Sequence, residues 1–82
     1  MPKINEAIVI KTMTEALQVT DGTLTKDSAL GDVEAWDSLG HLSILSALDE
    51  LFEGKVGSIN EMATSDSIKK ILNALRNNSL IE

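Results

Sequence analysis

Apolar side chains recur along the chain at the spacing of amphipathic helices. Residues 4–18 carry the first such stripe, formed by Val9, Ile10, Met13, Ala16 and Leu17. The last stripe is formed by Ile68, Ile71, Leu72 and Leu75; Thr64 or Ser65 can cap its helix, with Asp66 in the first turn. Side chains spaced i, i+3, i+4 and i+7 share one helix face, so both stretches are predicted to be helical. No stretch alternates as a strand would.

The middle of the chain contains another predicted helix, whose ends are marked by capping residues. Asp37 is a favourable N-cap, and the helix is expected to run to about Glu53, with Gly54 in the C′ position. Its core face is expected to consist of Ile44, Leu45, Leu48 and Phe52. The segment 55–62 holds enough apolar residues for one short helix.

A long polar stretch separates the first two predicted helices. Residues 20–36 are rich in Thr, Asp, Ser and Gly, which favours turns. We expect this stretch to be anchored over the end of the helices by its apolar residues, which are Leu24, Leu30, Val33 and Trp36. The chain is therefore predicted to be one all-α domain over residues 1–82. We expect a four-helix bundle with three longer helices, one short helix and a long first loop.

The charge of the chain narrows the classes of partner. Thirteen acidic residues against seven lysines and arginines give a formal net charge of -6. Such a surface repels phosphate backbones, so we expect no nucleic-acid binding and a preference for basic partner surfaces. No apolar run approaches the ~18 residues that span a bilayer, so no membrane span is expected. The absence of cysteine suits a reducing compartment, and we expect a cytoplasmic monomer.

The sequence lacks the motifs of common catalytic sites. There is no Gly-rich phosphate loop, G-x-S-x-G elbow or H-E-x-x-H motif. Ser38 and His41 stand three residues apart, but no third residue that would orient the histidine is apparent. The loop acids Asp21, Asp27 and Asp32 do not match the spacing of a calcium loop. We therefore expect no catalytic residue and no metal site.

One face of the middle helix combines two leucines with hydroxyls and acids. Leu39 and Leu42 lie opposite the core face, and the polar residues beside them are Ser38, Ser43, Ser46, Asp49, Glu50 and Glu53. Isolated surface leucines are common and need no function. An apolar centre with a charged rim, however, is also how a transient docking surface is built.

Ser38 lies just inside the N-terminus of this helix. An Asp-Ser pair is common capping chemistry, which is one interpretation of Asp37 and Ser38. The other interpretation is covalent modification, because a phosphodiester on Ser38 would face unpaired backbone N–H groups and the positive end of the helix dipole.

The stretch around Ser38 resembles the phosphopantetheine attachment motif of acyl carrier proteins. The match comprises Asp37-Ser38-Leu39 within residues 31–42 (GDVEAWDSLGHL), together with residues 47–52 (ALDELF). The length, helix order, acidity and lack of cysteine agree with it, so the resemblance covers essentially the whole chain. The form Trp-Asp-Ser-Leu-Gly-His-Leu is more similar to specialised carriers of polyketide, peptide or polysaccharide pathways than to those of primary fatty acid biosynthesis.

The resemblance implies that a phosphopantetheinyl transferase moves 4′-phosphopantetheine from coenzyme A onto the Ser38 hydroxyl. The thiol of this arm would carry an acyl or aminoacyl group as a thioester and present it to loading and acyl-transfer enzymes with basic docking surfaces. Asp37 would cap the helix and face the magnesium site of the transferase. The family's partner-facing positions correspond to Leu39, Leu42, Asp49, Glu50 and Glu53. The alternative is an unmodified acidic helical adaptor that binds a partner through the same helix.

Three further residues near Ser38 bear on its surroundings, and two of them have more than one interpretation. His41 is either a boundary histidine paired to the loop, or a contact to the arm or a charge switch. Trp36 is either a loop anchor or a contact to the cargo. Gly40 costs up to ~1 kcal/mol relative to alanine in a helix, and we interpret it as leaving room beside the arm.

Overall fold

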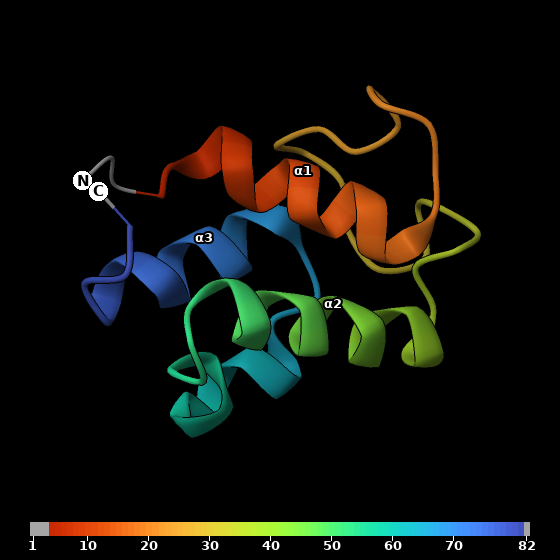
Figure 1. Cartoon of the computed structure of the whole chain (residues 1–82). Coiled ribbons are helices and arrows are strands. Elements are labelled where there is room, and N and C mark those ends of the chain that lie inside the picture. Colours follow the sequence, from red (N-terminus) through yellow and green to blue (C-terminus); the bar gives the residue numbers. More distant parts are fainter. Residues whose placement is uncertain (1–3, 82) are drawn as a thin grey trace.

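The structure, a computed structural model that describes residues 4–81, is built around three α-helices (Figure 1). They are α1 (Glu6–Leu17), α2 (Ser38–Leu51) and α3 (Ile68–Asn77). Two short 3-10 helices, η1 (Val56–Ser58) and η2 (Asn60–Thr64), lie between α2 and α3. Within residues 4–81 there is no strand, only two isolated bridge pairs. The expectation of a small helical domain is confirmed.

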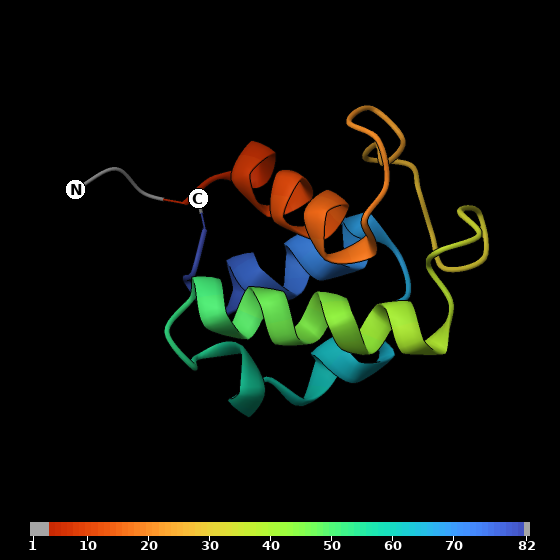
Figure 2. The same ribbon diagram turned by 45° about the vertical axis from the view of Figure 1, so that its right-hand side comes forward.

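α1 packs against both other α-helices and runs opposite to them (Figures 1 and 2). The start of α1 therefore lies at the same end as the end of α3, where the Glu6 carboxylate pairs with Arg76 of α3 and with Lys26 of the loop. The loop between α1 and α2 passes over the other end, next to the start of α2. None of the described helices is long and apolar enough to cross a membrane.

The core consists almost entirely of aliphatic side chains from the three helices, with contributions from the loop and η2. The whole apolar stripe predicted for α3 is buried, as are Ile44 and Leu48 of α2 and Phe52, which follows α2; Leu45 is half-buried. Burying one such side chain contributes roughly 1.5–3 kcal/mol. The local pattern of apolar residues therefore predicts the inward faces of the helices correctly.

The long loop is held by backbone bonds as well as by apolar anchors. Leu24 and Trp36 are buried as expected, but Leu30 is 41% exposed, so its predicted role as an anchor is wrong. The backbone explains the difference. The Leu30 N–H donates to the Asp66 carbonyl at 2.7 Å, and the Ile68 N–H donates to the Ser28 carbonyl at 3.0 Å. These bonds tie the loop to the chain just before α3 without burying the Leu30 side chain.

The segment between α2 and α3 differs from the prediction in two respects. The single short helix expected over 55–62 is replaced by η1 and η2, because Ile59 between them is extended (φ -92°, ψ 101°). The N-cap of α3 is Ser67 and not Thr64 or Ser65. Both of those hydroxyls instead donate to the Glu61 carbonyl and close the turn of η2. Asp66, which precedes the cap, pairs with Lys70 at 2.9 Å.

Each of the three α-helices is followed by a residue in the left-handed conformation, and none of these residues is glycine. These residues are Gln18 (φ 57°), Glu53 (φ 58°) and Ser79 (φ 60°). After each helix, the left-handed residue and the one that follows it donate backbone hydrogen bonds to two of the last carbonyls, which is the Schellman arrangement. After α2 it is Glu53 that occupies C′, so the expected placement of Gly54 at C′ is wrong by one residue.

Candidate functional site

The start of α2 is organised around Asp37. Its Oδ1 atom accepts a hydrogen bond from the Gly40 N–H at 2.8 Å, and its carbonyl accepts the His41 N–H, also at 2.8 Å. Asp37 is extended (φ -109°, ψ -165°), as an N-cap must be. The predicted cap is therefore confirmed, and Ser38 becomes the first helical residue.

Ser38 is exposed at this helix start. Within residues 4–81 its hydroxyl makes no hydrogen bond, and the backbone N–H groups of Ser38 and Leu39 are also without a protein acceptor. These N–H groups carry the partial positive charge of the helix N-terminus. An anionic substituent on the Ser38 oxygen would lie beside donors that no other part of the described chain uses.

Two leucines follow on the exposed face of α2. Leu39 is 75% exposed and Leu42 is 62% exposed, the two largest values among the exposed large hydrophobic residues of the described chain. Ser43, Ser46 and Glu50 are exposed beside them. We call the surface formed by Leu39, Leu42, Ser43, Ser46 and Glu50 the exposed α2 face. Glu53 is also exposed, but it lies beyond the helix end.

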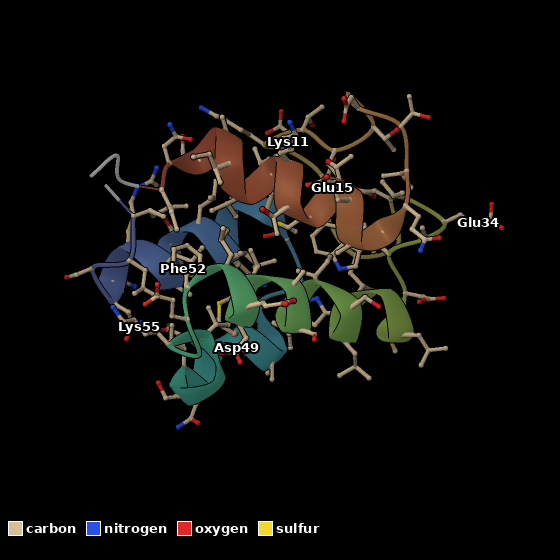
Figure 3. All side chains as sticks on the ribbon, viewed as in Figure 1. Lys11, Glu15, Glu34, Asp49, Phe52 and Lys55 are labelled. Carbon is tan, nitrogen blue, oxygen red and sulfur yellow. The ribbon has the colours of Figure 1, made fainter. Side chains whose placement is uncertain are left out.

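Asp49 differs from the other expected partner-facing residues. It is half-buried, and its Oδ1 atom accepts the Gly57 N–H of η1 at 2.7 Å. Figure 3 shows Asp49 on the side of α2 nearest this segment. The carboxylate thus fastens η1 to α2, a structural contact that the helical wheel could not reveal.

His41 and Trp36 lie beneath the exposed start of α2. Both side chains are buried, and the Trp36 Nε1–H donates to His41 Nδ1 at 3.1 Å. Their rings are nearly parallel, with an interplanar angle of 14° and centroids 6.2 Å apart. On its other side, the His41 Nε2 atom lies 3.1 Å from the Met62 carbonyl oxygen of η2. The interpretations of Trp36 as a loop anchor and of His41 as paired to the loop are confirmed.

Gly40 has a different role from the one expected. A Cβ atom at this position would lie 2.1 Å from the Ala35 carbonyl oxygen and 2.9 Å from Leu17 Cδ2. The space that the glycine leaves is therefore filled by the loop backbone and by the end of α1. The interpretation that Gly40 leaves room beside an arm is wrong.

The surface of the described residues carries several hollows. A hollow of about 220 Å³ lies between α2 and the 3-10 helices, and its apolar lining comes mainly from Leu45, Val56, Ile59 and Met62. This hollow is smaller than the ~300–1,000 Å³ of typical ligand pockets. A second hollow, of about 500 Å³, is lined in part by Leu42, Ser46 and Glu50 of the exposed α2 face. Residues 4–81 contain no group of three or more His, Asp or Glu side chains that could hold a metal ion.

Comparisons with protein-family models, with curated proteins and with solved structures found no match for this chain.

Proposed function

We propose that this protein is a carrier on which the Ser38 hydroxyl bears 4′-phosphopantetheine, and that the thiol of this arm holds an acyl or aminoacyl group as a thioester. The observation that carries the proposal is the setting of Ser38. It is exposed, its hydroxyl is unbonded in the described chain, and it directly follows the Asp37 cap and precedes two exposed leucines. The resemblance of residues 31–42 to the attachment motif of acyl carrier proteins supports the same assignment.

In the proposed modification, a base of the transferase removes the proton of the Ser38 hydroxyl. The Oγ atom then forms a bond to the phosphorus that bears the pantetheine group, and adenosine 3′,5′-bisphosphate leaves with the electron pair of the broken P–O bond. The phosphodiester is anionic, so the free N–H groups at the start of α2 stabilise it by about 0.3–1 kcal/mol. Asp37 is proposed to face the magnesium site of the transferase, with Asp37 Oδ1 retained by Gly40.

The exposed α2 face is the proposed docking surface for the transferase and for acyl- or aminoacyl-loading and transfer enzymes. Leu39 and Leu42 supply the apolar anchors, while Glu50 and Glu53 supply charge complementary to basic partners. In this proposal the helices form the four-helix bundle of a carrier, with η1 and η2 in the place of the short helix. The protein works as a cytoplasmic monomer in a specialised fatty-acid, polyketide, peptide or polysaccharide pathway.

Intact mass measurement tests the proposal directly. The protein is incubated with coenzyme A and a phosphopantetheinyl transferase of broad specificity, and we expect a gain of one phosphopantetheine group. Ser38→Ala should gain nothing, whereas the matched control Ser43→Ala, which removes another exposed hydroxyl of α2, should be modified like the wild type. Modification of Ser38→Ala, or none of the wild type, would overturn the assignment.

A second function also fits the exposed α2 face, because binding of a partner through this face does not require any modification of Ser38. An unmodified acidic adaptor would use the same leucines and acids to bind a basic partner. The mass measurement separates the two functions, since an adaptor would stay unmodified in the presence of an active transferase and its coenzyme.

A further inference from the structure

Trp36 and His41 occupy paired positions on either side of the helix start. With Asp37 as N-cap, Trp36 is the N′ residue and His41 is the N4 residue of α2. Apolar residues at N′ and N4 often pack together as a hydrophobic staple, which fixes the direction in which the chain enters the helix. Here the two buried rings lie nearly parallel and are joined edge to edge by the 3.1 Å hydrogen bond from Trp36 Nε1 to His41 Nδ1.

This hydrogen-bonded staple closes residues 36–41 into a compact unit. Asp37 binds the N–H groups of both Gly40 and His41 inside the same six residues. The loop carbonyl of Ala35 is held so close to Gly40 that no side chain fits between them. Asp37, Ser38 and Leu39 are the exposed members of this unit, and the Asp37 side chain is held by the Gly40 N–H.

The hydrogen bonds also determine which ring nitrogen of His41 carries the proton. The indole N–H of Trp36 can only donate, so His41 Nδ1 must accept and carries no proton. The ring proton is then on Nε2, which donates to the Met62 carbonyl at 3.1 Å. Neutral His41 therefore links three separate elements, namely the loop before α2, α2 itself and η2.

We propose that Trp36 and His41 are positioning residues that hold the start of α2 in the orientation in which Ser38 is presented for modification. This inference rests on the proposed function and adds to it the residues that prepare the acceptor hydroxyl. Neither side chain contacts the reacting oxygen. Their effect is transmitted through the loop and the first turn, because both are buried, Trp36 is bonded to His41, and His41 is in turn bonded to η2.

Three variants separate positioning from folding. His41→Gln keeps one acceptor and one donor on a neutral side chain, His41→Leu removes both, and Trp36→Phe keeps a ring but removes the indole N–H. The kcat/KM of the transferase is measured with each folded protein. We expect a loss of about five- to tenfold for Trp36→Phe, which corresponds to one lost hydrogen bond, and at least as large a loss for His41→Leu, which loses two. His41→Gln should give a value near wild type.

The matched control is Ile71→Val, which weakens the core of α3 but leaves the staple intact. It should be modified at the wild-type rate at a temperature where all the proteins are folded. Equal kcat/KM for His41→Leu, Trp36→Phe and Ile71→Val, or no rescue by His41→Gln, would overturn the inference.

A second measurement keeps the inference separate from the proposed function. Hydrogen exchange of the Gly40 and His41 amides reports on the helix start without any transferase. Both amides should exchange several-fold faster in His41→Leu than in His41→Gln. If wild-type protein is never modified, the proposed function fails while this difference still supports the staple. If the two variants exchange alike, the staple itself is overturned.

Discussion

At the scale of single residues, Gly40 shows how a tertiary contact can reverse a local preference. Helix propensity alone would make alanine better than glycine here by up to ~1 kcal/mol. The Ala35 carbonyl, however, lies 2.1 Å from where the Cβ atom would be, and it belongs to backbone that the Trp36 anchor holds in place. We predict that Gly40→Ala lowers the free energy of unfolding by about 1–3 kcal/mol, measured by urea denaturation.

Ser43→Ala is the control for this substitution, because Ser43 is an exposed residue of the same helix. Its effect should stay within about 0.5 kcal/mol. A Gly40→Ala variant as stable as wild type would mean that the loop gives way easily and does not constrain the start of α2.

Individual residues also show which features the sequence can predict. The Asp37 cap follows from the chemistry of a few neighbouring residues, and the structure has it as predicted. The wrong N-cap expected for α3 has a different origin, because the Thr64 and Ser65 hydroxyls are used by the preceding turn. The bond from Gly57 to Asp49 likewise depends on how η1 folds back onto α2, which no local pattern contains.

At the scale of elements, the helix ends are sites where stability can be gained. The left-handed conformation costs a residue with a side chain about 1–2 kcal/mol, whereas glycine adopts it without this cost. We predict that Gln18→Gly and Ser79→Gly each raise the free energy of unfolding by about 0.5–1 kcal/mol, once the added flexibility of the unfolded chain is subtracted. Thermal unfolding followed by circular dichroism measures this.

Asn73→Gly provides the contrast, since Asn73 is exposed in the middle of α3. Glycine there should be destabilising, because it gains no relief of backbone strain and loses helix propensity. Equal destabilisation by Gln18→Gly and Asn73→Gly would contradict our account of the helix ends.

The exposed α2 face leads to a prediction about docking. Desolvated apolar anchors usually carry affinity, whereas rim charges mainly set association rate and salt dependence. In transferase kinetics, Leu42→Ala should therefore lower kcat/KM by about tenfold, and Glu53→Ala by about threefold or less. Leu42 is largely exposed, so its truncation should leave the melting temperature unchanged. If Glu53→Ala is as damaging as Leu42→Ala, the division of roles is wrong.

The elements themselves were predictable to different degrees. The three α-helices were predicted because each carries an apolar stripe within its own sequence, and the start of α2 was predicted because Asp37 marks it. The 3-10 helices and the backbone bonds between the loop and the start of α3 were not, since they depend on contacts between distant parts of the chain. At the candidate site, the sequence pointed to the exposed residues, while the buried Trp36–His41 bond became visible only with the fold.

At the scale of the whole molecule, lowering the pH should destabilise the fold by protonating the carboxylates that form its ion pairs. The pKa of the Glu6 carboxyl is lowered from its usual 4.5, chiefly by its hydrogen bond with Arg76 and further by Lys26. The pKa of Asp66 is lowered from 3.8 by its hydrogen bond with Lys70. Because the folded pKa values are below the unfolded ones, these pairs stabilise the protein above about pH 4.5, and this contribution is lost as the pH falls through the folded values.

Glu6→Gln tests this reasoning because it removes the carboxylate that links α1, α3 and the loop. We predict a lower melting temperature than wild type at pH 7 and a difference that shrinks as the pH falls below about 4. Glu34→Gln is the matched control, since Glu34 projects from the loop away from the helices and forms no ion pair within residues 4–81 (Figure 3). A difference that stays constant with pH would show that Glu6 acts through packing and not through its charge.

At neutral pH, added salt should raise the melting temperature, whereas lowering the pH should decrease it. Salt has this effect because it screens the total charge of the molecule. The net charge is -6, and within residues 4–81 ion pairs involve three acids, namely Glu6, Asp27 and Asp66. Exposed ion pairs contribute little to stability, so their screening costs little, while screening relieves repulsion among the other carboxylates. We therefore predict that the melting temperature rises when the ionic strength increases from about 0.01 M to about 0.15 M, as the Debye length shortens from ~30 Å to ~8 Å. The rise should be smaller in a double variant, Asp21→Asn with Glu34→Gln, which carries less negative charge. A melting temperature that stays level or falls with salt would show that the few ion pairs outweigh the excess charge.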